Sequence, residues 1–327
     1  MKKRLLSTVL SMSMIAGMMV GVTAFAEEET EAPAAYAEEA LGGKWGVAVP
    51  NATNSFYSTC VAGVEDTVAE LDPDASVIVT DASFDSQKQL DQVADLVSQG
   101  VKALVLIPID SNAILPAVEE AAEAGIPVLV MDTPCGETDG VVSTVIADNY
   151  NLGEIAGRAL LEEIGGEGEI VTITTTGSEA VNNRKQALYD LIENEYPDIK
   201  ITQEEIVQNG TTEEALTIME NILQGGSDVK GVFTTGDVFA IGICSALKAN
   251  GYEPGEIAVT SIDGTTNAAE LIESGYLLAT AAQSPHALGE NCVKNGLAYL
   301  SGEEVEELQA LSCTEVNADN VADYVGF

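Results

Sequence analysis

The residues best suited to chemistry lie between Glu256 and Pro285, where two apolar runs each end in a polar side chain. The first run, Ile257–Ile262, is rich in β-branched residues and is followed by Asp263. The second, Tyr276–Ala282, is followed by Gln283. Such runs are typical of buried parallel strands, and open α/β sheets bind ligands beyond the carboxyl ends of their strands. We therefore expect a carboxylate and an amide to lie together there, where both can bind hydroxyl groups.

Aromatic and amide side chains follow the first predicted strand. Asn54 precedes two adjacent rings, Phe56 and Tyr57, in a chain with only 5% aromatic residues. Asn54 or Ser55 could cap the helix that follows. The rings could pack into the core, or they could form a flat apolar wall for a sugar ring whose hydroxyls bind the Asn54 amide.

Three charged residues occupy comparable positions elsewhere. Asp132 ends another predicted strand, where it could also simply form a turn. Arg184 lies at a polar helix start after the threonine-rich strand end at 174–176, and a surface cation would have the same signature. Asp237 follows a strand and could serve as a helix N-cap. Each signal is ambiguous alone, but their shared place beyond strand ends makes the group a candidate ligand site.

Two series of alternating strands and helices position these side chains. The predicted strands are Trp45–Val49, Ser76–Thr80, Ala103–Ile107, Pro127–Met131 and Val141–Val145, then Glu169–Thr174, Ile199–Val207, Gly231–Thr234, Ile257–Ile262 and Leu277–Ala282. The predicted helices are Ser58–Leu71, Gln87–Gln99, Ile114–Ala124, Ala147–Ile164, Val181–Glu195, Glu213–Leu223, Phe239–Asn250, Thr265–Glu273 and His286–Leu300. This alternation indicates βαβ units, and hence two doubly wound α/β domains with parallel sheets.

The N-terminal residues have the order of an export signal. Three cations at positions 2–4 precede a mostly apolar stretch, Leu5–Val22, and then Ala24-Phe25-Ala26. This pattern predicts a signal peptide over 1–26 that is cleaved before Glu27. An uncleaved membrane anchor is the alternative, because the apolar stretch nearly reaches spanning length. The acidic, alanine-rich segment 27–43 is predicted to be a disordered linker.

Charge and composition exclude several functions. A formal net charge of −40 would repel nucleic acid and anionic lipid surfaces. With one histidine and no C-x-x-C pair, the chain offers little for a zinc site or Cys–His catalysis, so no metal or cofactor is expected. The five cysteines are scattered at Cys60, Cys135, Cys244, Cys292 and Cys313. An odd number leaves at least one unpaired thiol in a monomer, and buried free thiols would account for all five.

A series of motifs between about Lys44 and Leu311 resembles the ribose/galactose type of periplasmic sugar-binding protein, the substrate-binding component of ABC importers. The motifs are GVAVPNATNSFYSTCVAGV, ALVLIPIDSNAI, GIPVLVMDT, IADNYNLGEIAG, the arginine of NNRKQAL, GVFTTGDVFAIGI and SIDGTTNAAELIESGYLLATAAQSP. The resemblance implies two lobes joined by three hinge crossings and closing over a ligand cleft. The N-terminal lobe would comprise 44–146 and 284–311, and the C-terminal lobe 147–283 and 312–327.

The same resemblance implies roles for individual residues. Those that would contact a sugar are Asn54, Phe56, Tyr57, Asp132, Arg184, Asp263 and Gln283, with Asp237 flanking the site. The ribose pattern is not reproduced at five positions. Thr133 replaces an arginine of that pattern, and Gly236 replaces an asparagine. Ile107 replaces a polar residue, Ile262 replaces an aromatic residue, and a second aromatic residue is missing near Gly210. The expected pocket is therefore larger and less cationic than a ribose site.

These features together predict a non-catalytic, exported monomer, in the periplasm or at the cell surface. It would capture a neutral sugar or polyol and deliver it to an ABC transporter permease. Three alternatives compete with this prediction. One is a receptor that presents its ligand to a membrane sensor or chemoreceptor. Another is a sugar-responsive repressor, which would need a DNA-binding motif where the leader lies. The last is a sugar hydrolase with Asp132 and Asp263 as its carboxylate pair.

Overall fold

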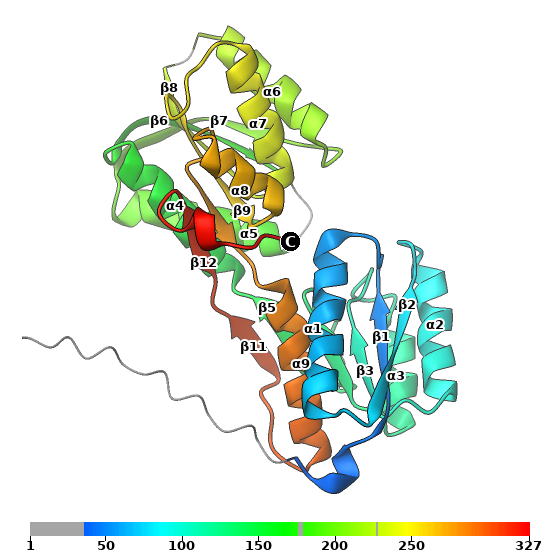
Figure 1. The fold of residues 1–327 in the computed structure, drawn as a ribbon. Coiled ribbons are helices and arrows are strands. Elements are labelled where there is room, and N and C mark those ends of the chain that lie inside the picture. The colour runs from blue at the N-terminus through cyan, green and yellow to red at the C-terminus, as the bar shows by residue number, and fades with distance from the viewer. Residues whose placement is uncertain (1–35, 176–178, 227) are drawn as a thin grey trace, which may run out of the picture. The chain divides into compact units, whose positions relative to one another are not determined.

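The computed structural model describes residues 36–175, 179–226 and 228–327. The leader predicted for 1–26, and residues 27–35 of the predicted linker, lie outside this range. Within it the chain forms two α/β lobes, each built on its own six-stranded sheet (Figure 1). The prediction of two α/β domains with mainly parallel sheets is confirmed.

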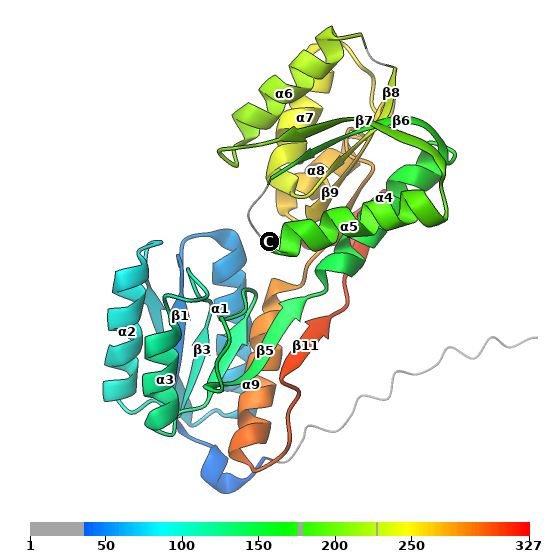
Figure 2. The same ribbon diagram turned by 180° about the vertical axis from the view of Figure 1, so that it is seen from behind.

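The first lobe has a fully parallel sheet with the strand order β11-β5-β4-β3-β1-β2. Its strands are β1 (Gly43–Val49), β2 (Ala75–Asp81), β3 (Ala103–Leu106), β4 (Val128–Met131), β5 (Val141–Ala147) and β11 (Leu308–Leu311). Helices α1 (Ser55–Leu71) and α9 (Pro285–Leu300) cover one face, and α2 (Ser86–Ser98) and α3 (Leu115–Glu123) cover the other. Helices therefore pack on both faces of this sheet, as Figure 2 shows from behind.

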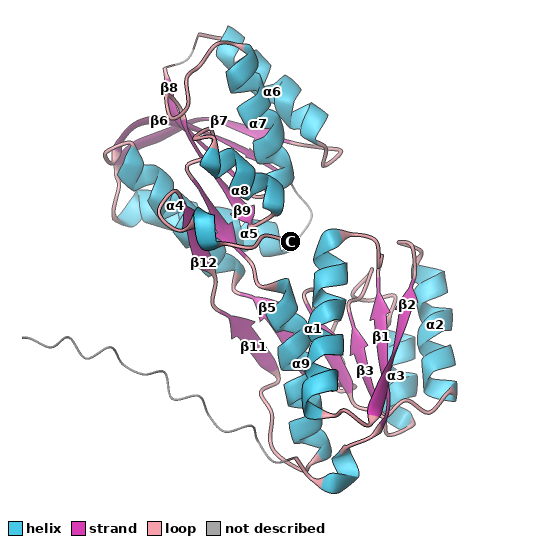
Figure 3. Ribbon diagram, in the orientation of Figure 1, coloured by secondary structure: helices cyan, strands magenta, loops and turns pink. Residues whose placement is uncertain are grey.

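The second lobe has the strand order β12-β10-β9-β8-β6-β7. Its strands are β6 (Glu167–Thr174), β7 (Asp198–Ile206), β8 (Val229–Thr234), β9 (Ala258–Asp263), β10 (Ala279–Ala282) and β12 (Thr314–Asn317). Helices α4 (Asn149–Glu163) and α5 (Glu179–Asn194) pack on one face, and α6 (Thr212–Gln224), α7 (Asp237–Ala249) and α8 (Thr266–Glu273) pack on the other. Only β12 runs antiparallel to its neighbour, β10. Figure 3 shows the strands of each lobe enclosed by helices.

Burial on both faces explains why central strands such as β1, β3 and β4 are largely apolar. In β1, Val47 packs in the cluster beneath α1 and α9, and its neighbour Ala48 packs in the cluster beneath α2 and α3. Successive side chains of a strand point to opposite faces, so a sheet covered on both sides requires a continuous apolar run.

The two sheets are linked at three places. The chain passes from β5 to α4, from β10 to α9, and from β11 to β12. Neither β11 nor β12 was predicted from the sequence. Each has only four residues and lies at the edge of its sheet, and Leu308 in β11 is 58% exposed. Short, half-polar edge strands lack the apolar run by which the other strands were found.

The part of the predicted linker that the structure describes is held against the first lobe. The short 3-10 helix η1 (Glu38–Ala40) precedes β1, which begins at Gly43 rather than after it. The buried Asp72 carboxylate accepts hydrogen bonds from the Gly42 amide at 2.6 Å and the Trp45 indole at 3.1 Å, and it pairs with the Lys102 ammonium. These contacts hold Gly42 and the start of β1 in place. The structured part of the chain therefore begins before Gly43, whereas the sequence predicted a disordered linker through Gly43.

Two further features bear on the sequence predictions. Within residues 36–175, 179–226 and 228–327, no helix is both long enough and apolar enough to cross a membrane. All five cysteines are free thiols, and Cys60, Cys244 and Cys292 are buried.

Candidate functional site

The loop between β1 and α1 is shaped by a helix cap. Asn54 precedes α1, and its side-chain oxygen accepts hydrogen bonds from the backbone amides of Phe56 at 3.0 Å and Tyr57 at 3.4 Å. These bonds satisfy amides at the helix start that have no partner within the helix. Because capping occupies the Asn54 oxygen, the NH₂ group is the part of this amide that can donate to a ligand.

The rings of Phe56 and Tyr57 lie half-buried at the start of α1. Their centroids are 5.6 Å apart in an edge-to-face arrangement, and Tyr57 lies 6.2 Å from a third ring, Phe84. Burial, followed by the nearby Asp132 charge, raises the pKa of Tyr57 to about 12. The Tyr57 hydroxyl therefore keeps its proton at neutral pH and can donate a hydrogen bond.

Asp132 follows β4 in a backbone conformation that L-residues rarely adopt. Its φ is +67°, its amide donates to the Val145 carbonyl at 2.9 Å, and the Thr133 hydroxyl donates to its Oδ2 at 2.9 Å. Burial raises the pKa of the Asp132 carboxyl to about 6, although the Thr133 hydrogen bond and the Arg184 charge act to lower it. Rare backbone conformations cluster at functional sites, where the surrounding structure holds them.

Arg184 is the center of a polar cluster in the second lobe. Its side chain lies in α5 and the residue is only 9% exposed, unlike a surface cation. Its Nε donates to the Asn149 side-chain oxygen at 2.9 Å, and its Nη1 donates to the Thr235 carbonyl at 2.9 Å. The same Nη1 lies 3.5 Å from Oδ1 of Asp263. Three segments therefore hold the guanidinium in place.

Asp263 and Gln283 meet because β9 and β10 are adjacent parallel strands. The Gln283 side-chain amide donates to Asp263 Oδ1 at 2.8 Å, and its backbone amide donates to the Asp263 carbonyl at 2.9 Å. Asp263 has a φ of +136°. Burial raises the pKa of its carboxyl, and the Arg184 charge opposes this shift.

Both of these side-chain contacts reach Oδ1 of Asp263, and a hydrogen bond from the Asp237 backbone amide to the carboxyl also acts to lower its pKa. Gly236 lies beside the second oxygen, Oδ2, since a Cβ on Gly236 would be 3.5 Å from it. The absence of a side chain at Gly236 therefore leaves room next to a carboxylate oxygen that can accept a hydrogen bond.

Asp237 has a different environment from the other candidates. It is fully buried, and its two oxygens accept hydrogen bonds from the hydroxyls of Ser261, Thr280 and Thr265 and from the amides of Gly264 and Thr265. Asp237 is the first residue of α7, and Gly236 takes the N-cap position, so the expected N-cap role is wrong. Its contacts instead fix the loop that follows Asp263.

Comparison with known proteins identifies the family. Residues 45–304 match the model of the periplasmic binding protein domain. The chain belongs to this family. It is 31% identical over 264 residues to the ribose import binding protein RbsB of Bacillus subtilis, which covers 80% of this chain and 83% of that protein.

Other relatives are similar over most of the chain. The D-apiose import binding protein of Paraburkholderia graminis is 28% identical over 279 residues, covering 84% of this chain and 87% of the relative. A solved ABC transporter solute-binding protein of Bacillus halodurans with bound myo-inositol is 25% identical and has a TM-score of 0.75. That match covers 88% of this chain and 99% of the solved chain.

In this periplasmic binding protein, three predicted site residues are in direct contact: Arg184, Asp263 and Gln283. Asp132 lies close enough for the charges of Arg184 and Asp263 to affect its pKa. Asn54 caps α1, and Phe56 and Tyr57 lie in the first turn of that helix. Sequence reasoning missed Asn149, Thr235 and Phe84. Asn149 lies within the quoted IADNYNLGEIAG motif and Thr235 within the quoted GVFTTGDVFAIGI motif. Thr235 takes part through its backbone carbonyl, which any residue type offers, so its identity gave no signal.

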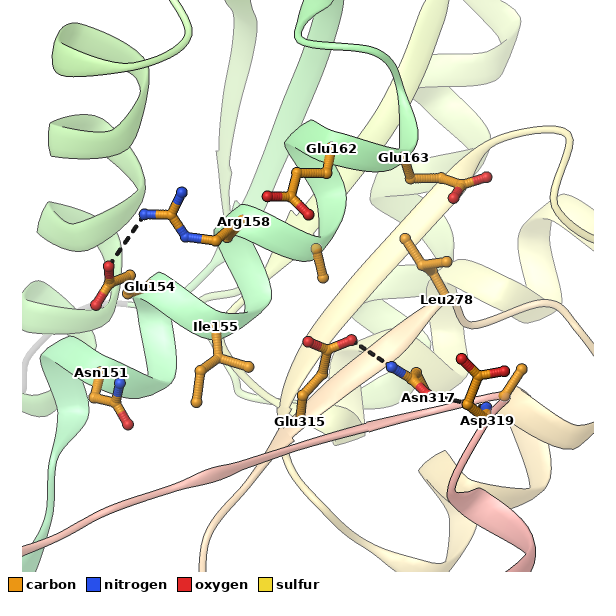
Figure 4. A pocket seen from close by; sticks show the side chains of 12 residues that line it. Asn151, Glu154, Ile155, Arg158, Glu162, Glu163, Leu278, Glu315, Asn317 and Asp319 are labelled. Carbon is orange, nitrogen blue, oxygen red and sulfur yellow. Dashed lines mark hydrogen bonds and ion pairs between the residues drawn. The ribbon is translucent and has the colours of Figure 1, made fainter. Parts of the chain in front are cut away.

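A surface pocket of about 680 Å³ lies elsewhere in the second lobe of this family member, between α4 and β12 (Figure 4). No predicted site residue lines it. Its one arginine, Arg158, pairs with Glu154 at 3.2 Å and with Glu195 at 2.7 Å. The cation of this pocket is therefore already engaged by neighbouring carboxylates.

Proposed function

We propose that this periplasmic binding protein captures a neutral sugar or related polyol and delivers it to the permease of an ABC importer. The carrying observation is the cluster of Arg184, Asp263 and Gln283 at the strand ends of the second lobe, with the space at Gly236 beside Asp263 Oδ2. A carboxylate acceptor beside a guanidinium donor matches neighbouring hydroxyls on a ring. Relatives that are import binding proteins for ribose and D-apiose support this role.

The energetics of such a site favour selective binding. Hydrogen bonds to charged groups contribute about 1.5–3 kcal/mol each. A sugar that lacks one of the required hydroxyls would leave a desolvated carboxylate or guanidinium without its partner, which lowers its affinity. The rings of Phe56 and Tyr57 would cover an apolar face of the sugar, so the two lobes provide complementary kinds of contact.

Lobe closure would follow from this division of contacts. A ligand bound by residues of both lobes favours the arrangement in which all of them reach it. The three crossings would form the hinge. Two of them are tied together, because the Asn151 side-chain oxygen near the first crossing accepts a hydrogen bond from the Cys313 amide in the third at 3.3 Å.

Asp237 would act as a positioning residue. Three of its five hydrogen bonds hold Gly264 and Thr265, which directly follow Asp263, and the other two come from Ser261 and Thr280. Asp237 would thus set the direction of the Asp263 carboxylate without touching the ligand. Export by the predicted leader would place the mature chain in the periplasm or at the cell surface. There it would act as a monomer without a cofactor or metal, and the proposed role needs no catalysis.

A binding screen tests the proposal. Wild-type protein is heated with each of a panel of pentoses, hexoses and polyols, and a ligand at 100 times its Kd is expected to add about 2.7 kcal/mol of stability. Asp263→Asn should weaken the best ligand by roughly 10²-fold, because an amide cannot replace the carboxylate as a charged acceptor. The matched control is Asp228→Asn, which changes an exposed carboxylate paired with Lys230. A panel without any stabilising sugar or polyol would overturn the proposal.

A further inference from the structure

The residues after β12 are fixed onto the loop that carries Asp263. They pass through the 3-10 helix η2 (Val321–Asp323), where Val321 is buried. The Tyr324 hydroxyl then donates to the Gly264 carbonyl at 2.6 Å, and the Thr266 amide donates to the Phe327 carbonyl at 3.3 Å. The backbone of residues 324–327 is thereby attached next to the candidate carboxylate.

A glycine makes this attachment possible. A Cβ placed on Gly326 would lie 2.5 Å from the Thr266 backbone nitrogen, a distance that real side chains essentially never show. Only glycine at this position lets the segment approach the start of α8 so closely. The position of the next residue, Phe327, is therefore set by specific packing.

The Phe327 ring contacts the first lobe's candidate binding loop. Its centroid lies 5.6 Å from that of Phe56 at an interplanar angle of 71°. Phe56 in turn contacts Tyr57, and Tyr57 contacts Phe84, so four rings form a continuous row. Three of the six phenylalanines in the chain belong to this row. Figures 1 and 2 both place the end of the described chain, marked C, beside the start of α1.

The second lobe otherwise offers polar groups to a ligand. Arg184, Asp263 and Gln283 are hydrogen-bonding residues, and Ile262 is fully buried in the core beneath α4 and α5. A sugar also has apolar C–H surface, which binding sites cover with aromatic side chains. In the described part of this lobe, Phe327 is the ring that reaches the aromatic wall of the opposite loop.

We propose that Phe327 closes the ligand site by packing against Phe56 and thereby slows ligand release. The inference rests on the function proposed above. Phe56 lies in the first turn of α1 in the first lobe, and Phe327 follows β12 of the second lobe, so their contact stabilises the arrangement that encloses the ligand. Changes to a single contact usually alter the dissociation rate more than the association rate.

The test compares Phe327→Ala with Val325→Ala by stopped-flow kinetics, using the sugar that binds best in the screen. Val325 is the matched control because it lies in the same segment but is 90% exposed. From the usual strength of edge-to-face ring pairs, we expect the dissociation rate of Phe327→Ala to be about threefold to tenfold faster than that of wild type. The association rate should change by less than about twofold. Phe327→Leu should release at an intermediate rate, and Val325→Ala at the wild-type rate.

The results separate this inference from the proposed function. If Asp263→Asn loses affinity while Phe327→Ala releases sugar at the wild-type rate, the site stands and the role of Phe327 is refuted. If wild-type protein binds no sugar or polyol, the proposed function fails. A double-mutant cycle then tests separately whether the Phe56 and Phe327 rings stabilise the protein by their contact. The cycle compares the shifts in thermal midpoint of Phe56→Ala, Phe327→Ala and the double variant. A double-variant shift equal to the sum of the two single shifts would refute the ring contact, and a smaller shift would support it.

Discussion

Arg184→Ala removes a guanidinium that three segments of the second lobe hold in place. The substitution deletes its hydrogen bonds to Asn149 and Thr235 and its charge beside Asp263. Because helix α5 is packed by Leu188 and Leu191 independently of this side chain, the fold should persist. Asp263 would keep its hydrogen bond from Gln283 but would lose the neighbouring positive charge.

The expected loss of affinity can be worked out from these contacts. Nη2 of Arg184 has no hydrogen bond to the described residues, so it is the nitrogen that can donate to a ligand. One charge-assisted hydrogen bond contributes about 1.5–3 kcal/mol, and 1.4 kcal/mol corresponds to a tenfold change in Kd. With the added misplacement of Asp263, we expect the Kd to rise by roughly 10²-fold or more.

Isothermal titration calorimetry with the sugar found in the screen measures this change. Arg158→Ala is the matched control, since Arg158 is a partly exposed arginine of the same lobe that pairs with Glu154 and Glu195. Its removal should leave the Kd within twofold of wild type. Arg184→Lys should bind weakly, because an ammonium cannot reproduce the planar fork. An unchanged Kd for Arg184→Ala, with the native circular dichroism spectrum, would refute the assignment of Arg184 to the ligand site.

Two other measurements examine titration and motion. The pKa of Asp132 is raised from 3.8 to about 6, so the folded protein binds this proton more tightly than the unfolded chain. The protonated carboxyl therefore stabilises the fold at low pH, and this stabilisation is lost as pH rises from about 4 to about 6. Asp132→Asn should therefore flatten the pH dependence of the unfolding midpoint in that window, and an unaltered profile would contradict this. Small-angle scattering should give a smaller radius of gyration with saturating sugar than without it, and equal values would count against lobe closure.

The sequence predicted the strands that carry an apolar or β-branched run, including the edge strands β2 and β7, and failed for β11 and β12. Ile257–Ile262 was predicted as a strand, and β9 covers Ala258–Asp263, because the β-branched run fills two core clusters. The strands β11 and β12 were not predicted, because each has only four residues and no continuous apolar run. The signal for a strand therefore came from the apolar or β-branched run itself, which β11 and β12 lack.

The same physical limit applies to the candidate site. The meeting of Asp263 and Gln283 could be predicted, because residues at the carboxyl ends of neighbouring parallel strands must lie together. The contact of Phe327 with Phe56 could not, since it joins segments far apart in sequence and depends on the close approach of Gly326 to Thr266. Periodicity reports local structure, but such a contact depends on the packing of the whole chain.

The shortness of the third crossing has a mechanical consequence. Only Ser312 and Cys313 separate β11 from β12, and each of these strands is hydrogen-bonded into a different sheet. A joint of two residues has four soft backbone torsions and no slack, so it can twist but cannot lengthen. Together with the bond from Cys313 to Asn151, it would act as a fixed pivot that sets the axis of any rotation between the lobes. Inserting even a few glycines there should loosen the direction of motion while leaving every ligand contact in place.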